Sequence, residues 1–311
     1  MDPTYGWTLA SLLDVEPPPA PADFASFWTG LHRRARSVDP TATMRPSPGG
    51  AAPGSEVYDV EFTSAGGVRL GGWLVLPADG HVERGLVVGH GYGGRQEPDP
   101  RPLADHAAVL FPCARGLPAR GLVEGIPDVA ERHVLHGIGD RDGYVHGGCA
   151  ADVWCAVSAL CEMVPQARAR IDYVGASFGG GIGALAVPWD DRIDAACLVV
   201  PSFGDHPLRV TLPCTGSGEA VRRRVAACPG TLDVLRYFDA ATAATFIDVP
   251  VHVGLALADP AVPPPGQFAV YNALAGPRER FVLTGGHMEY EGMDDETEAL
   301  LAAQRAFLGR S

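Results

Sequence analysis

The segment Ile171 to Gly181 reads Ile-Asp-Tyr-Val-Gly-Ala-Ser-Phe-Gly-Gly-Gly, and it decides the fold. A mostly apolar run leads into Gly-x-Ser-x-Gly around Ser177, and small residues continue to Ala186. This order predicts a buried strand, a sharp turn and a helix, with glycines that let the backbone expose the serine. Because the chain has 39 glycines, the motif alone can arise by chance as a turn without chemistry. The flanking strand and helix make Ser177 a candidate nucleophile.

Two downstream residues complete a candidate triad. A serine nucleophile needs an imidazole to accept its proton and a carboxylate to orient that imidazole, and on a strand-turn-helix scaffold these follow in the order Asp or Glu, then His. Asp259 comes directly after the apolar run 249–257, and His287 follows the next strand, in a Gly-Gly-His loop. Asp259 can instead be a turn former, and a loop histidine is often a surface residue. The chain order and the strand-end positions favour Ser177, Asp259 and His287 as the triad.

An oxyanion hole needs two backbone N–H groups aimed at the developing negative charge. The residue after the nucleophile, Phe178, is expected to supply one of them. The other is expected from the loop His90-Gly91-Tyr92-Gly93-Gly94, which follows an early apolar strand, and Tyr92 N–H is the candidate. This loop can also be an ordinary glycine turn. We interpret His90 as a structural histidine at the end of a strand.

The remaining pattern predicts an α/β fold in which a mostly parallel central sheet is flanked by helices. Residues 1–311 are expected to form one domain with an N-terminal arm (1–55), a loop insertion (114–148) and a helical excursion (203–239). Strands are predicted at 57–62, 68–76, 85–90, 107–112, 171–175, 195–200, 249–257 and 280–283, and helices at 21–36, 149–164, 179–187, 267–274 and 294–308. The first two strands are expected to form an antiparallel hairpin.

Composition narrows the classes of partner and chemistry. The formal charge of −13 disfavours binding to nucleic acid or to an anionic membrane. All 24 basic residues are arginines, so chemistry that requires lysine is excluded. The seven cysteines form no C-x-x-C pair and are expected to be reduced and mostly buried. The sequence shows neither a signal peptide nor a long apolar span, so a cytoplasmic location is expected.

The chain resembles the acetyl xylan esterase and cephalosporin C deacetylase family, carbohydrate esterase family seven, within the α/β-hydrolases. The resemblance extends over nearly the whole chain and rests on short matched segments in the same order. They include Asp23-Phe24 with Phe27-Trp28, Tyr58-Asp59-Val60, Gly71-Gly72-Trp73-Leu74, His90-Gly91-Tyr92, Arg115-Gly116, the Ser177 turn, Tyr237-Phe238-Asp239, Val253-Gly254-Leu255, Pro263-Pro264, Tyr271-Asn272 and Ala275-Gly276-Pro277.

The resemblance implies a serine carboxylic ester hydrolase that removes acetyl groups from small acetylated sugars or related acetate esters through an acyl-enzyme. It implies the same triad and oxyanion hole, a substrate pocket that includes Tyr92, Arg115 and Phe178, no metal and no cofactor. It also implies a homo-oligomer, as a hexamer, in which the insertion 114–148 helps to form contacts between subunits.

Three residues depart from the family pattern. Leu117 replaces a glutamine in Arg-Gly-Gln, Phe178 replaces a glutamine after the nucleophile, and Met288 replaces a glutamate after the histidine. Because a backbone N–H survives the change at Phe178, we expect catalysis to persist in a more apolar pocket. Three alternatives remain open: an acyltransferase that uses the same triad, a short-chain esterase without preference for carbohydrates, and a catalytically silent scaffold.

Overall fold

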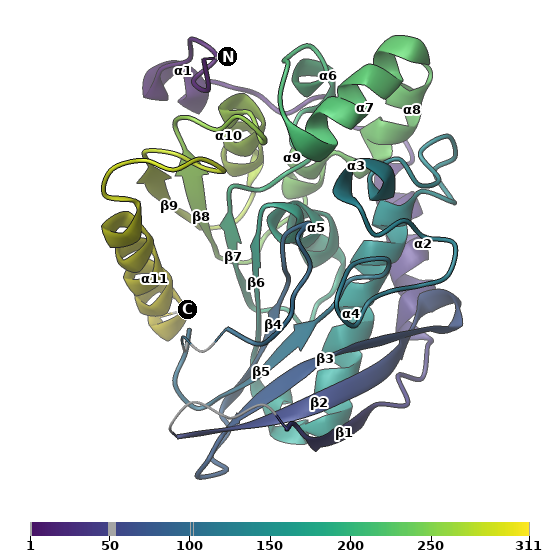
Figure 1. The fold of residues 1–311 in the computed structure, drawn as a ribbon, viewed down its shortest axis with the longest axis vertical. Coiled ribbons are helices and arrows are strands. Elements are labelled where there is room, and N and C mark those ends of the chain that lie inside the picture. The colour runs from purple at the N-terminus through teal and green to yellow at the C-terminus, as the bar shows by residue number, and fades with distance from the viewer. Residues whose placement is uncertain (1, 49–53, 100, 102, 311) are drawn as a thin grey trace.

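The computed structural model describes residues 2–48, 54–99, 101 and 103–310. Within them one twisted nine-stranded sheet crosses the molecule in the order β1-β2-β3-β5-β4-β6-β7-β8-β9 (Figure 1). The strands are β1 Thr43–Pro46, β2 Ser55–Ser64, β3 Val68–Pro77, β4 Arg84–Val88, β5 Ala107–Pro112, β6 Ile171–Ala176, β7 Ala195–Val199, β8 Val251–Ala256 and β9 Arg278–Leu283. Pairing is antiparallel from β1 to β5 and parallel from β5 to β9, so the predicted mostly parallel sheet is confirmed.

The helices lie mainly on one face of this sheet. They are α1 Leu9–Leu13, α2 Phe24–Arg36, α3 Ala130–His133, α4 Val145–Met163, α5 Phe178–Ala186, α6 His206–Arg209, α7 Gly216–Ala227, α8 Thr231–Leu235, α9 Ala240–Ala244, α10 Pro264–Ala273 and α11 Met293–Arg310. The five longer helices predicted from the sequence correspond to α2, α4, α5, α10 and α11. The predicted hairpin is also confirmed, with β2 and β3 joined through Ala65–Gly67, where Gly66 and Gly67 have positive φ.

Successive side chains along the strands point to opposite faces of the sheet, where two separate hydrophobic cores lie. Val87, Tyr173 and Leu198 point into the larger core, which contains α2, α4, α5 and α10, while their chain neighbours point to the other face. On that other face Phe307 and Leu308 of α11 join the smaller core. The large core is apolar through most of α4 and α5, so the sheet and these helices form a rigid platform for the residues at the strand ends.

The three less regular regions fold differently from one another. The predicted arm carries α1 and α2 but also β1, an exposed edge strand that pairs with β2 and was not predicted. The insertion is mostly irregular and contains the short helix α3, and α4 begins four residues earlier than predicted. The excursion holds α6, α7 and α8, which lie at the same end of the molecule as the N-terminus (Figure 1).

All seven cysteines are free, and Cys228 alone among them is exposed, as the sequence predicted for reduced packing residues. In the described part of the chain, no helix is long and apolar enough to cross a membrane.

Candidate active site

Ser177 lies on a strained turn between β6 and α5. Its backbone has φ 56° and ψ −116°, in a region that non-glycine residues rarely occupy. The neighbouring glycines are needed because the backbones approach closely: a methyl group on Gly175 would lie 2.5 Å from the carbonyl oxygen of Gly179. The rigid strand and helix therefore hold the serine hydroxyl at the carboxyl edge of the sheet, as the sequence predicted.

The structure brings the three predicted triad residues together. Ser177 Oγ lies 2.8 Å from His287 Nε2, and His287 Nδ1 lies 2.8 Å from Asp259 Oδ2. The carboxylate of Asp259 is inaccessible to solvent, whereas 31% of the His287 side chain is exposed. A buried carboxylate on one ring nitrogen fixes the tautomer that leaves the other nitrogen free to accept the serine proton.

Asp259 is held by a set of donors that the sequence analysis did not identify. Its Oδ1 accepts backbone N–H bonds of 2.9 Å from both Ala261 and Val262. The buried amide of Gln267 donates to Oδ2 over 3.2 Å and to the carbonyl oxygen of Val262 over 2.7 Å. These bonds fix the carboxylate before any substrate binds, so Gln267 acts as a positioning residue for Asp259.

The two predicted oxyanion-hole residues lie on either side of Ser177. Phe178 begins α5, so its N–H has no partner within the helix. A methyl group on Gly91 would lie 4.0 Å from Ser177 Cβ, which places the loop containing Tyr92 directly against the nucleophile. Among the described residues, the N–H groups of Tyr92 and Phe178 donate to no backbone carbonyl in the turns and loops. Both are therefore available to a negatively charged oxygen.

Aromatic rings pack together around Phe178, the residue that follows Ser177 in the chain, and form what we call the aromatic wall. Phe178 is buried, its ring centroid lies 4.4 Å from that of Tyr92, and both rings contact Phe203. The Tyr92 hydroxyl lies 3.1 Å from Nε2 of the buried His146. Phe178 is thus surrounded by the rings of Tyr92 and Phe203 and by three histidine rings, those of His90, His133 and His146.

Arg115 does not fit the expected role in a substrate pocket. Its guanidinium forms a buried ion pair with Asp152 of α4, with Nη2 to Oδ1 at 2.6 Å and Nε to Oδ2 at 3.0 Å. The same group donates to Ser64 Oγ and to the carbonyl oxygen of Ala65. The Nε and Nη2 groups of Arg115 therefore join the β2–β3 hairpin to α4. We assign Arg115 a structural role.

We therefore expect Arg115→Met to lower the free energy of unfolding by about 3–5 kcal/mol, because the change leaves the Asp152 carboxylate buried without its counter-ion. Urea unfolding of the purified variant measures this. The matched control is Arg310→Met, whose ion pair with Glu279 is 60% and 53% exposed and should contribute little. Equal effects of the two substitutions would contradict the structural role of Arg115.

His90 connects the loop that follows β4 with the segment that follows β5. Its Nδ1 lies 2.7 Å from the carbonyl oxygen of Gly91, and its Nε2 accepts the N–H of Ala114 over 3.0 Å. This pattern requires a neutral imidazole, and burial lowers the pKa of His90 to about 4. The sequence interpretation of His90 as a structural residue agrees with these contacts.

This depressed pKa predicts a pH dependence of stability. Below about pH 6.5 the imidazole binds a proton in the unfolded chain but not in the folded one. We therefore expect the wild type to lose more unfolding free energy than His90→Gln when the pH falls from 7 to 4.5, since glutamine does not titrate. Urea unfolding at both pH values gives the difference. Identical losses in the two proteins would contradict a buried neutral imidazole.

The N-terminus lies against the catalytic loop, a contact that the sequence did not reveal. The N–H of Asp259 donates to the carbonyl oxygen of Pro3 over 2.9 Å. Further along the arm, the amide of Asn272 donates to the carbonyl oxygens of Leu12 and Val15. The predicted arm thus supports the loop that carries the carboxylate.

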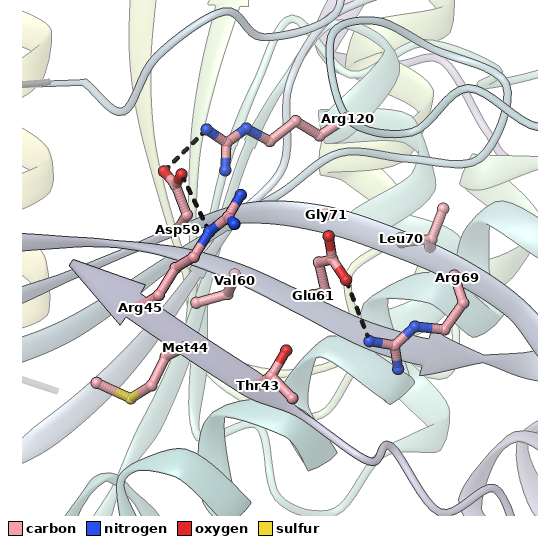
Figure 2. Close-up of a pocket in the computed structure, with 10 residues that line it drawn as sticks. All are labelled: Thr43, Met44, Arg45, Asp59, Val60, Glu61, Arg69, Leu70, Gly71 and Arg120. Carbon is pink, nitrogen blue, oxygen red and sulfur yellow. Dashed lines mark hydrogen bonds and ion pairs between the residues drawn. The ribbon is translucent and has the colours of Figure 1, made fainter. Parts of the chain in front are cut away.

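A separate polar hollow lies at the antiparallel end of the sheet. Figure 2 shows its lining, in which Arg45 and Arg120 converge on Asp59 while Arg69 faces Glu61. Its volume is about 600 Å³, and its lining comes from β1, β2, β3 and Arg120. It contains none of the triad residues, and these charged groups are paired, so it is no competing active site.

The structure shows where the three residues that depart from the family pattern lie. Leu117 is fully buried, Phe178 forms part of the aromatic wall, and Met288 is 36% exposed beside His287. No group of three or more His, Cys, Asp or Glu side chains suited to hold a metal ion occurs in the described residues.

A strained serine at a strand-turn-helix junction, followed in the chain by an aspartate and a histidine at later strand ends, defines a serine hydrolase of the α/β-hydrolase fold. Residues 15–302 match the acetyl xylan esterase (AXE1) family, so the chain belongs to that family and is a carboxylic ester hydrolase.

Solved structures show the same fold. Acetyl xylan esterase from Paenibacillus sp. R4 is 24% identical with a TM-score of 0.80, and 96% of this chain aligns with 99% of that one. Acetyl xylan esterase 1 from Thermoanaerobacterium sp. JW/SL YS485 is 21% identical with a TM-score of 0.79, and again 96% of this chain aligns with 99% of that one. The more distant acylaminoacyl peptidase from Pyrococcus horikoshii is 14% identical with a TM-score of 0.60, over 88% of this chain and 42% of that one.

Proposed function

We propose that Ser177, His287 and Asp259 remove acetyl groups from small acetate esters through an acyl-enzyme. The observation that carries the proposal is the unbroken chain of two 2.8 Å contacts from the buried Asp259 carboxylate through His287 to the serine hydroxyl. Such a chain makes a serine nucleophilic at neutral pH, because the imidazole takes the proton as the oxygen attacks.

The residues divide the reaction into two similar halves. Ser177 Oγ attacks the ester carbonyl while His287 takes its proton, and the N–H groups of Tyr92 and Phe178 stabilise the oxyanion. His287 then gives that proton to the departing alcohol, which leaves the acetyl group on Ser177. In the second half His287 activates a water molecule that attacks the acetyl-serine, and acetate is released as Ser177 regains its proton.

Tyr92 and Phe178 also form the proposed acyl pocket. The rings of Tyr92, Phe178 and Phe203 pack closely together, and only 2% of Phe178 and 1% of Phe203 is exposed, so this packed wall suits a short acyl group and disfavours a long one. Arg115 is left out of this pocket because its guanidinium is engaged with Asp152 and Ser64. The family membership supports acetylated xylo-oligosaccharides, or an acetylated antibiotic such as a cephalosporin, as candidate substrates.

We further propose that the chain is a single domain that assembles as a hexamer and acts in the cytoplasm on small esters rather than on polymers, without a metal or cofactor. The family resemblance supports the assembly, and the charge of −13 argues against a nucleic acid partner. In such an assembly the active sites would be reached only by small molecules.

The experiment that tests this function compares esters of increasing acyl length. We expect kcat/KM to be highest for acetate, lower for butyrate and lowest for octanoate esters of the same alcohol, because the ring wall limits the pocket. Polymeric acetyl-xylan should be cleaved far more slowly than acetylated oligosaccharides, and light scattering should give the mass of six chains. A monomer that prefers octanoate would refute both the deacetylase function and the assembly.

A further inference from the structure

Arg209, the last residue of α6, is a buried cation that forms no ion pair with any of the described residues. Only 4% of its surface is exposed, and its Nε and Nη1 are buried without a hydrogen-bond partner among the described residues. Burying a guanidinium in this state costs several kcal/mol, so proteins pair buried arginines almost without exception. An unpaired buried arginine therefore calls for a partner, and a ligand can supply it.

The nearby carboxylates have other partners. Glu219 pairs with Arg222 and Arg223, and Asp205 accepts the N–H of Leu208. Asp239 accepts four backbone N–H bonds, including that of His206, and Asp259 is bonded to His287. Among the described residues, none of these carboxylates forms an ion pair with Arg209.

The histidines around Arg209 do not change this balance. His206 and His146 are fully buried, and burial lowers the pKa of His206 to about 3 and that of His146 well below its usual range. Both rings are neutral at pH 7, and the Nδ1 atoms of both have no hydrogen-bond partner in the described residues. The surroundings of Arg209 thus combine one full positive charge with ring nitrogens that have no hydrogen-bond partner among the described residues.

This cation adjoins the catalytic centre on two sides. A methyl group on Gly218 would lie 2.5 Å from Arg209 Nη2 and 3.2 Å from the carbonyl oxygen of Ala261, whose N–H binds Asp259. On the other side, the ring of His206 in the same short helix packs against Phe203, whose ring contacts that of Tyr92. Helix α6, which carries Arg209, therefore lies near both the loop of the catalytic aspartate and the oxyanion-hole loop.

We propose that Arg209 is a binding site for a carboxylate close to the loop of the catalytic aspartate. The planar guanidinium offers parallel N–H donors that match a carboxylate, and in a water-poor site such a bond is strong. The carboxylate has two possible sources, an acidic group on the substrate or the acetate that hydrolysis releases. The proposal rests on the placement of the triad in the proposed function and adds a preference for anionic ligands.

Thermal unfolding tests binding without any need for catalysis. We expect sodium benzoate and sodium acetate, at constant ionic strength, to raise the Tm of the wild type by several degrees, while benzamide and acetamide do not. Arg209→Met should lose this response, and Arg209→Lys should keep part of it. If carboxylates and amides give the same shifts in the wild type, or if Arg209→Met responds like the wild type, the proposal is wrong.

The stability of the variants separates a binding role from a structural one. Arg209→Met should unfold at the same Tm as the free wild type or a higher one, because the unpaired buried charge is removed. The matched control is Arg192→Met, which should lower the Tm because Arg192 pairs with the buried Asp190 at 2.5 Å. A loss of Tm in Arg209→Met as large as in this control would show that Arg209 has a structural partner, against the proposal.

Kinetics then distinguish the two sources of the carboxylate. If the substrate carries it, kcat/KM for an acetate ester of a carboxylate-bearing alcohol, relative to its neutral amide, should fall at least about tenfold in Arg209→Met. If the product supplies it, this ratio should stay constant while inhibition by acetate weakens by a similar factor. No change in either quantity would overturn the proposal, and a wild type that binds benzoate but cleaves no ester would refute only the proposed function.

Discussion

Replacing Ser177 by alanine is expected to lower kcat for a small aryl acetate by roughly 10³- to 10⁶-fold, the loss seen when a nucleophile is removed from a cooperating triad. His287→Ala should fall in the same range, because Ser177 Oγ then loses the base that lies 2.8 Å away. Both variants should also lose covalent labelling by a fluorophosphonate, which requires an activated serine.

Ser202→Ala serves as the control, because Ser202 lies next to the turn, with its N–H bonded to the carbonyl oxygen of Ser177, but outside the triad. It should retain both hydrolysis and labelling. Near-normal hydrolysis by Ser177→Ala or His287→Ala would remove the triad assignment. Retained labelling of Ser177→Ala would mean that another residue is the nucleophile.

The sequence predicted the sheet and the proximity of Ser177, Asp259 and His287 because both depend on local patterns. Short apolar runs bounded by glycine or proline correspond to β4, β5, β6, β7 and β8, whose residues are buried on both faces. The order of Ser177, Asp259 and His287 at three strand ends was sufficient to bring them together, since parallel strands end at the same edge of a sheet.

Residues whose roles depend on distant contacts were missed. β1 is short and exposed, so Thr43 to Pro46 shows no apolar alternation, and only its pairing with β2 makes it a strand. The resemblance to the family implied that Arg115 is a pocket residue, but its guanidinium pairs with Asp152, 37 positions away in the chain. No motif in the sequence marks Gln267 or Arg209. The role of Gln267 follows from its buried contact with Asp259, and that of Arg209 from its burial without a partner among the described residues.

Gly286 is a further residue whose role the sequence did not reveal. It leaves no room for a side chain between the loop of His287 and the Asp259 carboxylate. A methyl group on Gly286 would lie 2.0 Å from Asp259 Oδ2 and 2.7 Å from its Cγ, far inside van der Waals contact. The carboxylate cannot withdraw, because Ala261 and Val262 hold its other oxygen and Gln267 donates to Oδ2. A side chain at this position must therefore separate His287 from Asp259.

We expect Gly286→Ala to lower kcat/KM for a small aryl acetate by about 10²- to 10⁴-fold, since displacement by about 1 Å or loss of the correct tautomer has effects of this size. Gly285→Ala is the matched control: its methyl group would meet the side chains of Tyr290 and Met288, which can move, so the loss should be far smaller. Steady-state kinetics and Tm are measured on both variants, so that a loss of activity can be separated from unfolding. If Gly286→Ala is folded and nearly as active as the wild type, the contact between His287 Nδ1 and Asp259 Oδ2 is not required for catalysis, because the added methyl group and this contact cannot occupy the same space.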